Sequence, residues 1–153
     1  MPTPSNNTPT KVTIKPDKNT SVNLNGYTEY TFFINAQEYK ELPLDANVRE
    51  PNPSKSQPYK EMINTLENSP EDFLENNLGI SAIAEKVERL SGEKFRLTFP
   101  SGTGILNGGH TQRAILDTKC KPETMNALVR INVREKKYTL DRIAEIAAAQ
   151  NST

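Results

Sequence analysis

Residues 105–115 read ILNGGHTQRAI, a short apolar run followed by two glycines and a segment of helical composition. We expect a short buried strand over residues 104–106 and a helix over residues 111–116. Two glycines allow the backbone to turn tightly and to approach a ligand closely. The start of a helix leaves N–H groups unpaired and carries a partial positive charge, so it suits an anion such as a phosphate. The stretch therefore predicts a strand–glycine–helix unit with a phosphate-binding turn.

The polar side chains of this stretch are candidate ligand-binding groups. Thr111 and Gln112 offer neutral donors, and Arg113 offers a planar cation for a phosphate or carboxylate. His110 is a candidate phosphate donor or general acid–base, and Asn107 either orients a ligand or caps the helix. The alternative is an ordinary strand–turn–helix connection, because glycine pairs are common at turns. The candidate ligand-binding residues of the stretch are Asn107, Gly108, Gly109, His110, Thr111, Gln112 and Arg113.

The segment before this stretch has the alternating pattern of strands. Residues 80–84 are predicted to form a strand whose alternation continues over residues 85–90. After a turn at Ser91-Gly92, residues 95–99 alternate again, which predicts a β-hairpin.

Helix patterns lie on both sides of these strands. Residues 59–66 have apolar side chains at i, i+3, i+4 and i+7, and Ser69 is expected to cap a second short helix. Residues 127–133 are the clearest strand of the chain, and the Ala-rich residues 140–149 are predicted to be helical. The sequence therefore predicts an α/β (α+β) fold, a mixed sheet with flanking helices.

The first part of the chain has a different composition. Residues 1–10 hold prolines and small polar residues and are expected to be a disordered lead. Residues 11–40 alternate around an Asn25-Gly26 turn, which predicts a small N-terminal β-hairpin unit. Residues 41–60 contain four prolines and are expected to form an extended connector. The main domain is predicted to cover residues 41–153.

Three further residues are candidates for the same ligand site. Arg49 lies in the connector and is within reach of a bound phosphate, although a surface charge or a structural ion pair is the alternative. Asn76 and Asn77 precede Gly79 at a predicted break, where they either line the cleft or make ordinary turn hydrogen bonds.

The composition excludes several classes of site. The chain has 153 residues with 19 basic and 19 acidic side chains, and this balance argues against broad nucleic-acid affinity. Its single cysteine, Cys120, and single histidine, His110, exclude an intramolecular disulfide and predict no metal site. A long apolar segment and a signal-peptide pattern are both missing, so we expect a cytoplasmic protein that does not contact membranes.

A local basic strip is a further candidate for nucleic-acid binding. It consists of Arg130, Arg134, Lys136 and Lys137. Single-stranded nucleic acids are usually held by cations together with exposed aromatic rings, and the sequence does not interleave such rings with this strip.

The residues around the glycine pair resemble a known superfamily. Asn107-Gly108-Gly109-His110-Thr111-Gln112-Arg113-Ala114-Ile115 is similar to the Gly-x-His-Arg-type box of the ParB/sulfiredoxin-like superfamily, in which a strand–glycine–helix unit holds nucleotide phosphates. The segment from Leu42 to Arg49 resembles the opening strand of that fold. Here Arg113 stands three positions after the histidine instead of directly after it.

Several short motifs resemble the abortive-infection phage-resistance (AIPR) family more closely. They are Asn68-Ser69-Pro70-Glu71-Asp72-Phe73, Asn76-Asn77-Leu78-Gly79-Ile80-Ser81, Ile105-Leu106-Asn107-Gly108-Gly109-His110-Thr111 and Ala149-Gln150-Asn151-Ser152. His110 stands where the family pattern usually has glutamine. The resemblance covers residues 42–153.

The resemblance implies a role in bacterial or phage-related defence. The ligand that it implies is a nucleotide, CTP or ATP, or a nucleic acid, with Mg²⁺ if the protein hydrolyses it. Two alternatives stay open. One is a protein-interaction or inhibitory module that has a protein partner and no ligand. The other is a nuclease or nucleotide hydrolase that uses His110.

Overall fold

The structure, a computed structural model, describes residues 8–44, 46, 56–119, 121, 124 and 126–151. The strands are β1 (Thr10–Ile14), β2 (Lys18–Leu24), β3 (Tyr27–Asn35), β4 (Ile80–Ala84), β5 (Lys86–Leu90), β6 (Lys94–Phe99), β7 (Gly104–Asn107) and β8 (Leu128–Glu135). The α-helices are α1 (Gln57–Asn68), α2 (Phe73–Asn76), α3 (Gly109–Thr118) and α4 (Leu140–Asn151), with 3₁₀ turns over Ala36–Glu38 and Pro70–Asp72.

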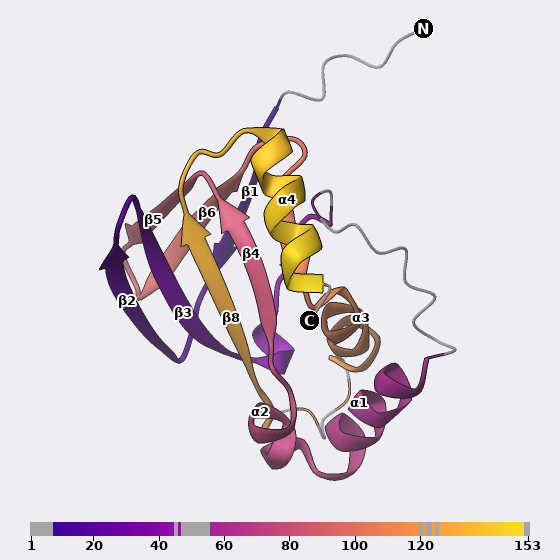
Figure 1. Cartoon of the computed structure of the whole chain (residues 1–153). Coiled ribbons are helices and arrows are strands. Elements are labelled where there is room, and N and C mark those ends of the chain that lie inside the picture. The colour runs from indigo at the N-terminus through magenta and orange to yellow at the C-terminus, as the bar shows by residue number, and fades with distance from the viewer. Residues whose placement is uncertain are drawn as a thin grey trace, which may run out of the picture.

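Two sheets organise the fold (Figure 1). The larger has the strand order β2-β3-β8-β4-β7, and the smaller has the order β1-β6-β5. β4 and β8 run parallel, whereas every other pairing is antiparallel. This mixed sheet with helices confirms the predicted α+β class.

The main core lies between the two sheets and beneath α1 and α3. Alternate residues of β3 and β8 face it, among them Phe32, Ile131 and Val133, and the smaller sheet contributes Phe95 and Leu97. These side chains are at most 1% exposed, which is the burial expected of strands with one solvent-facing side. A second cluster fixes α4 to the opposite face, at β4 and β7. Its buried members are Ala46, Ile83, Leu106, Ile143, Ile146 and Ala147.

Strands β1, β2 and β3 are built into the two sheets. The hairpin between β2 and β3 is confirmed, with Gly26 at a φ of +91°. β1, however, pairs with β6, and β3 pairs with β8 from Thr28 opposite Glu135 to Asn35 opposite Leu128. These strands do not form a sheet of their own. Of the predicted disordered lead, Thr10 begins β1 and residues 1–7 lie outside the described residues.

The connector contributes one anchored segment. Leu42 is 1% exposed, Leu44 forms a bridge with Gly104, and the Ile105 N–H donates to the Pro43 oxygen at 2.8 Å. Residues 43–44 therefore cover the outer edge of β7. Within the described ranges, none of the helices is both long and apolar enough to cross a bilayer.

Two local predictions need correction. The alternation over residues 80–90 is not one continuous strand, because the chain leaves the larger sheet after Ala84 and enters the smaller one at Lys86. Ser69 caps the next helical turn without its side chain: its backbone oxygen accepts from the Asp72 N–H at 2.9 Å. A helix of one 3₁₀ turn followed by α2 is too short to present the regular first turn that a side-chain cap requires.

Candidate functional site

A pocket of about 440 Å³ lies where α3 begins, beside the last residue of β7 and the loop between α2 and β4. Its wall combines apolar side chains with amide and hydroxyl groups, and it includes five asparagines. The residues that line it are Pro58, Met62, Asn76, Asn77, Leu78, Gly79, Ile80, Ser81, Asn107, Gly108, Gly109, His110, Thr111, Asn132 and Asn151. The glycine pair thus lies at a hollow of the surface.

The first turn of α3 opens into this pocket. Gly108 is the N-cap at a φ of +105°, and no side chain of the described residues caps the helix. The first backbone hydrogen bond of the turn runs from the Gln112 N–H to the Gly108 oxygen at 3.0 Å. The N–H groups of the residues before Gln112 precede this bond and are the ones that a helix start leaves for other acceptors. Asn107, a candidate cap, is instead the exposed last residue of β7.

Only glycine fits at the turn. A Cβ on Gly108 would lie 2.8 Å from the Gly79 oxygen and 2.9 Å from the Ile80 Cα. The start of α3 therefore packs directly against the start of β4, which brings the two loops of the pocket together.

Asn77 connects these loops through its side chain. Its Oδ1 accepts from the Gly79 N–H at 2.7 Å, and its Nδ2 donates to the Thr111 hydroxyl at 3.2 Å. Thr111 is 5% exposed, so its hydroxyl forms the floor of the pocket. Asn77 therefore holds the α2–β4 loop on the first turn of α3, whereas Asn76 is exposed at the wall.

Three polar side chains of the wall, those of Ser81, Asn132 and Asn151, were not among the predicted site residues. Ser81 pairs in register with both Asn132 of β8 and Asn107 of β7, so neighbouring strands place these side chains side by side. The Asn151 Nδ2 donates to the Leu106 oxygen at 2.9 Å and to the Ala147 oxygen at 2.8 Å, which holds the end of α4 on β7. The alternation of Asn132 with buried residues in β8 predicts that it lies on the polar face of the sheet, but it does not predict that it lines the pocket.

Two predicted residues of the stretch point elsewhere. Gln112 is 2% exposed and its side chain binds the connector: Oε1 accepts from the Leu42 N–H at 2.9 Å and from the Tyr39 hydroxyl, and Nε2 donates to the Leu42 oxygen at 3.1 Å. Arg113 is exposed and pairs with Asp117, one turn along α3, at 3.4 Å. Neither side chain lines the pocket. Arg49 and Cys120 lie outside the described residues.

The pocket wall is uncharged apart from the titratable imidazole of His110, a half-buried residue. Among the described residues that line it, none is an aspartate, glutamate, lysine or arginine. Across all the residues that the structure describes, no three His, Cys, Asp or Glu side chains gather as metal ligands would. A ligand would thus meet backbone N–H groups, neutral polar side chains and apolar side chains such as Met62 and Leu78.

Tyr39, which donates to Gln112, has a fully buried phenol that loses solvation. Burial, with a smaller contribution from the negative charge of Glu41, raises the pKa of Tyr39 well above its ordinary value. As the pH rises past about 10, the phenol of Tyr39 therefore loses its proton in the unfolded chain before it does so in the folded one. The stability that the protonated phenol contributes below that pH is lost above it.

We expect the free energy of unfolding to fall between pH 10 and pH 11 as this proton is lost. Tyr39→Phe should make the fall shallower by up to about 1.4 kcal/mol per pH unit. Tyr30 and Tyr59, whose pKa values are raised by burial and by a hydrogen bond to Asp117 respectively, keep a residual slope in the variant. Urea unfolding from pH 8 to pH 11 measures the difference, and identical slopes would contradict it.

Comparison with known proteins identifies the family. The family model described as AIPR protein matches residues 44–153, which is 110 of the 153 residues. Searches of curated proteins and of solved structures each found no match. The match covers the strands, loops and helices that build the pocket, and it confirms the resemblance seen in the short motifs. The chain therefore belongs to the AIPR family of phage-defence-related domains.

Proposed function

We propose that the pocket binds the phosphate of a nucleotide or of a nucleic acid, as part of a bacterial or phage-related defence protein. The observation that carries the proposal is the first turn of α3, which has a glycine N-cap and faces a hollow lined by neutral donors. Backbone N–H groups and the helix dipole favour an anion at such a position. The strand–glycine–helix unit also supports a ParB/sulfiredoxin-like arrangement around the ligand.

The chemistry of the wall favours a phosphate over a cation. Asparagine Nδ2 groups, the Thr111 and Ser81 hydroxyls and the His110 imidazole can all donate hydrogen bonds to phosphate oxygens. No carboxylate among the described lining residues repels an anion. A lysine or arginine is not required, since a compact phosphate site needs only a helix start and well-placed donors.

The size of the pocket suits a nucleotide. Its volume of about 440 Å³ falls in the range of ~300–1,000 Å³ that small-molecule sites occupy. Amide side chains can pair with the donor and acceptor pattern of a base, so CTP and ATP are the nucleotides to try first. The lining residues do not supply the carboxylates that Mg²⁺ prefers, so an accompanying ion would be held by the phosphates of the nucleotide itself.

Asn107→Asp tests the proposal with a change of a single atom. Asn107 is exposed at the pocket and directly precedes the glycine N-cap, where a carboxylate is compatible with the helix dipole and competes with a phosphate. We expect the affinity for the nucleotide to fall at least tenfold, about 1.4 kcal/mol. Isothermal titration with CTP, ATP, GTP and a short DNA measures it.

Two controls accompany this measurement. Asn23→Asp adds the same charge on the β2–β3 hairpin and keeps the oxygen that accepts from Thr28 at 2.9 Å, so its affinity should equal that of the wild type. Gly109→Val places a branched side chain in the first turn of α3, at the pocket wall, and should weaken binding as well. Negligible heat for the unmodified protein with all four ligands would overturn the proposal.

The same samples are also assayed for hydrolysis of the nucleotide or DNA. If the protein is a nucleotide hydrolase or nuclease, phosphate or cleaved DNA is released in the presence of Mg²⁺ and the release disappears in His110→Ala. Release that is unchanged in this variant excludes His110 as the acid–base group.

A second candidate function, protein interaction, is favoured by one residue of the rim. Leu78 is 95% exposed although it lies between Asn77 and Gly79 at the edge of the pocket. An apolar side chain at such a position suits contact with a protein partner.

A further inference from the structure

We propose that the uncovered face of the larger sheet binds single-stranded nucleic acid. This face, called the open face below, is formed by the residues of β2, β3 and β8 that alternate with the core residues. Its members are Lys18, Thr20, Val22, Leu24, Tyr27, Glu29, Thr31, Phe33, Arg130, Asn132 and Arg134. The proposal does not rest on the pocket, because Asn132 is the one open-face residue that also lines the pocket.

The register establishes that these side chains share one face. Phe33 lies opposite Arg130, and Thr31 lies opposite Asn132, with the Asn132 Nδ2 3.3 Å from the Thr31 hydroxyl. The intervening residues, such as Phe32, are in the core. Among the described elements, α4 covers the β4 and β7 side of this face, and α2 contacts β8 where that strand begins. Figure 1 shows no helix over β2, β3 or the rest of β8.

Two arginine–aromatic pairs lie on the open face. The Arg130 guanidinium carbon is 5.7 Å from the centre of the Phe33 ring, and that of Arg134 is 4.9 Å from the centre of the Tyr27 ring. Phe33 and Tyr27 are six residues apart along β3, about 20 Å in an extended strand. Bases stack on both aromatic rings and guanidinium planes, so each pair offers a stacking position.

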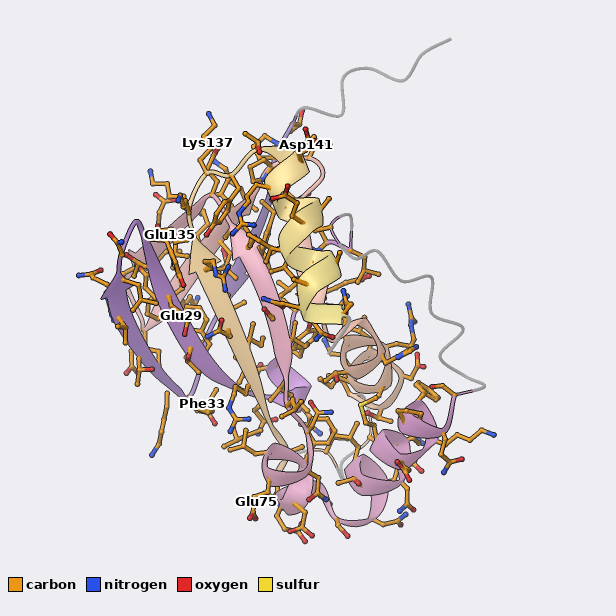
Figure 2. The ribbon with its side chains drawn as sticks, in the orientation of Figure 1. Glu29, Phe33, Glu75, Glu135, Lys137 and Asp141 are labelled. Carbon is orange, nitrogen blue, oxygen red and sulfur yellow. The ribbon has the colours of Figure 1, made fainter. Side chains whose placement is uncertain are left out.

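The sequence could not reveal these pairs. The basic strip lacks interleaved aromatic residues along the chain, but strand pairing supplies them from β3, about a hundred positions earlier. Figure 2 shows Phe33 and Glu29 along β3, in the part of the sheet over which no helix is drawn. The folded protein therefore brings aromatic rings next to the basic strip, as a surface that binds single strands requires.

The charge of the open face suits a polyanion. Phe33 lies between Lys18 and Arg130 in register, and Lys136 continues β8 beside the β2–β3 turn, where its Nζ is 3.5 Å from the position of a Cβ on Gly26. Glu29 is the acidic member. The three cations of the open face and the adjacent Lys136 thus stand against one carboxylate. This local excess of positive charge is hidden by the neutral net charge of the chain.

The shape of the face favours a single strand over a duplex. A flat sheet has no protruding element to enter a groove, whereas the bases of a single strand are free to lie on it. The face also continues into the pocket, because Asn132 belongs to both and pairs in register with Ser81. A strand that lies on the sheet would thus lead toward the start of α3.

Two variants separate stacking from charge in a binding assay. Fluorescence anisotropy with an oligothymidylate of about 12 nucleotides, repeated at several salt concentrations, gives the affinity and its salt dependence. Phe33→Leu should weaken binding about fivefold to a hundredfold and leave the salt slope unchanged. Arg130→Gln should weaken binding and reduce the salt slope by about 0.7.

A control variant, a check of the fold and a control ligand accompany the binding assay. Arg142→Gln removes a cation from the exposed side of α4, where Arg142 pairs with Glu145 at 3.2 Å, and should leave binding within about twofold of wild type. Circular dichroism of each variant verifies that the fold is intact. A polyglutamate of similar length serves as an anionic peptide without bases.

Four outcomes would overturn the proposal. They are no oligonucleotide binding by the unmodified protein, unchanged affinity in Phe33→Leu, an equal loss in Arg142→Gln, and binding of polyglutamate as tight as that of the oligonucleotide. Loss of oligonucleotide binding in Asn107→Asp but not in Phe33→Leu would overturn the open face while supporting the pocket. Loss in Phe33→Leu alone would support the open face and leave the pocket to the nucleotide titration.

Discussion

Gln112→Ala should lower the free energy of unfolding by about 3–5 kcal/mol, the largest effect expected of any single side-chain truncation in the strand–glycine–helix stretch. The amide makes three hydrogen bonds in a buried setting, two with the backbone of Leu42 and one with the Tyr39 hydroxyl. Truncation leaves all three partners unpaired, at about 1–3 kcal/mol for each that stays buried. The bonds also attach the connector to α3, so its detachment would add to the loss.

The neighbouring residue provides a matched control. Arg113 is longer and charged, but it is exposed and its only ion pair among the described residues is with Asp117. Arg113→Ala should change the free energy of unfolding by less than about 1 kcal/mol. Urea unfolding at pH 7 compares the two variants, and a loss below about 1 kcal/mol in Gln112→Ala would contradict the buried contact.

Gly79→Ala should cost about 3 kcal/mol or more. Gly79 has a φ of +90°, and a Cβ there would lie 2.2 Å from the Arg130 backbone oxygen. Because β4 is parallel to β8 and begins beside this oxygen, the strand start must move outward to relieve the clash. The N–H that binds Asn77 would move with it, so the wall of the pocket would be displaced as well.

Gly92→Ala separates the clash from the backbone conformation. Gly92 has a φ of +74°, but no described atom lies within 4 Å of a Cβ built there. This variant should lose only about 1–2 kcal/mol, the cost of a left-handed conformation in a residue with a Cβ. Equal losses for the two alanine variants in urea unfolding would show that the close approach at Gly79 is not a determinant of stability.

Most elements could be predicted from local patterns, because each has the hydrophobic period of its structure. The strand over residues 127–133 and the helix over residues 140–149 are found as β8 and α4 with small changes of boundary. The pairing of β1 with β6 could not be predicted, because it joins segments more than eighty residues apart whose alternation fits many partners.

The site was predicted in part for the same reason. The glycine pair marked the start of α3, and Asn76 and Asn77 preceded a break, so their places in the pocket follow from local signals. The polarity of Gln112 suggests a ligand donor, but the residue stands three positions before the buried Ile115 and thus on the inner side of α3. Asn132 reaches the pocket only through the strand order.

The position of β3 bears on how this domain can be dissected. The family match begins at residue 44, yet β3 lies before it and is hydrogen-bonded along the whole length of β8. A fragment cut at residue 44 would expose the main-chain donors and acceptors of β8 beside Val129, Ile131 and Val133. Such a long, apolar, unprotected strand is a template for self-association. Recombinant work on this domain therefore has to retain β3 if aggregation is to be avoided.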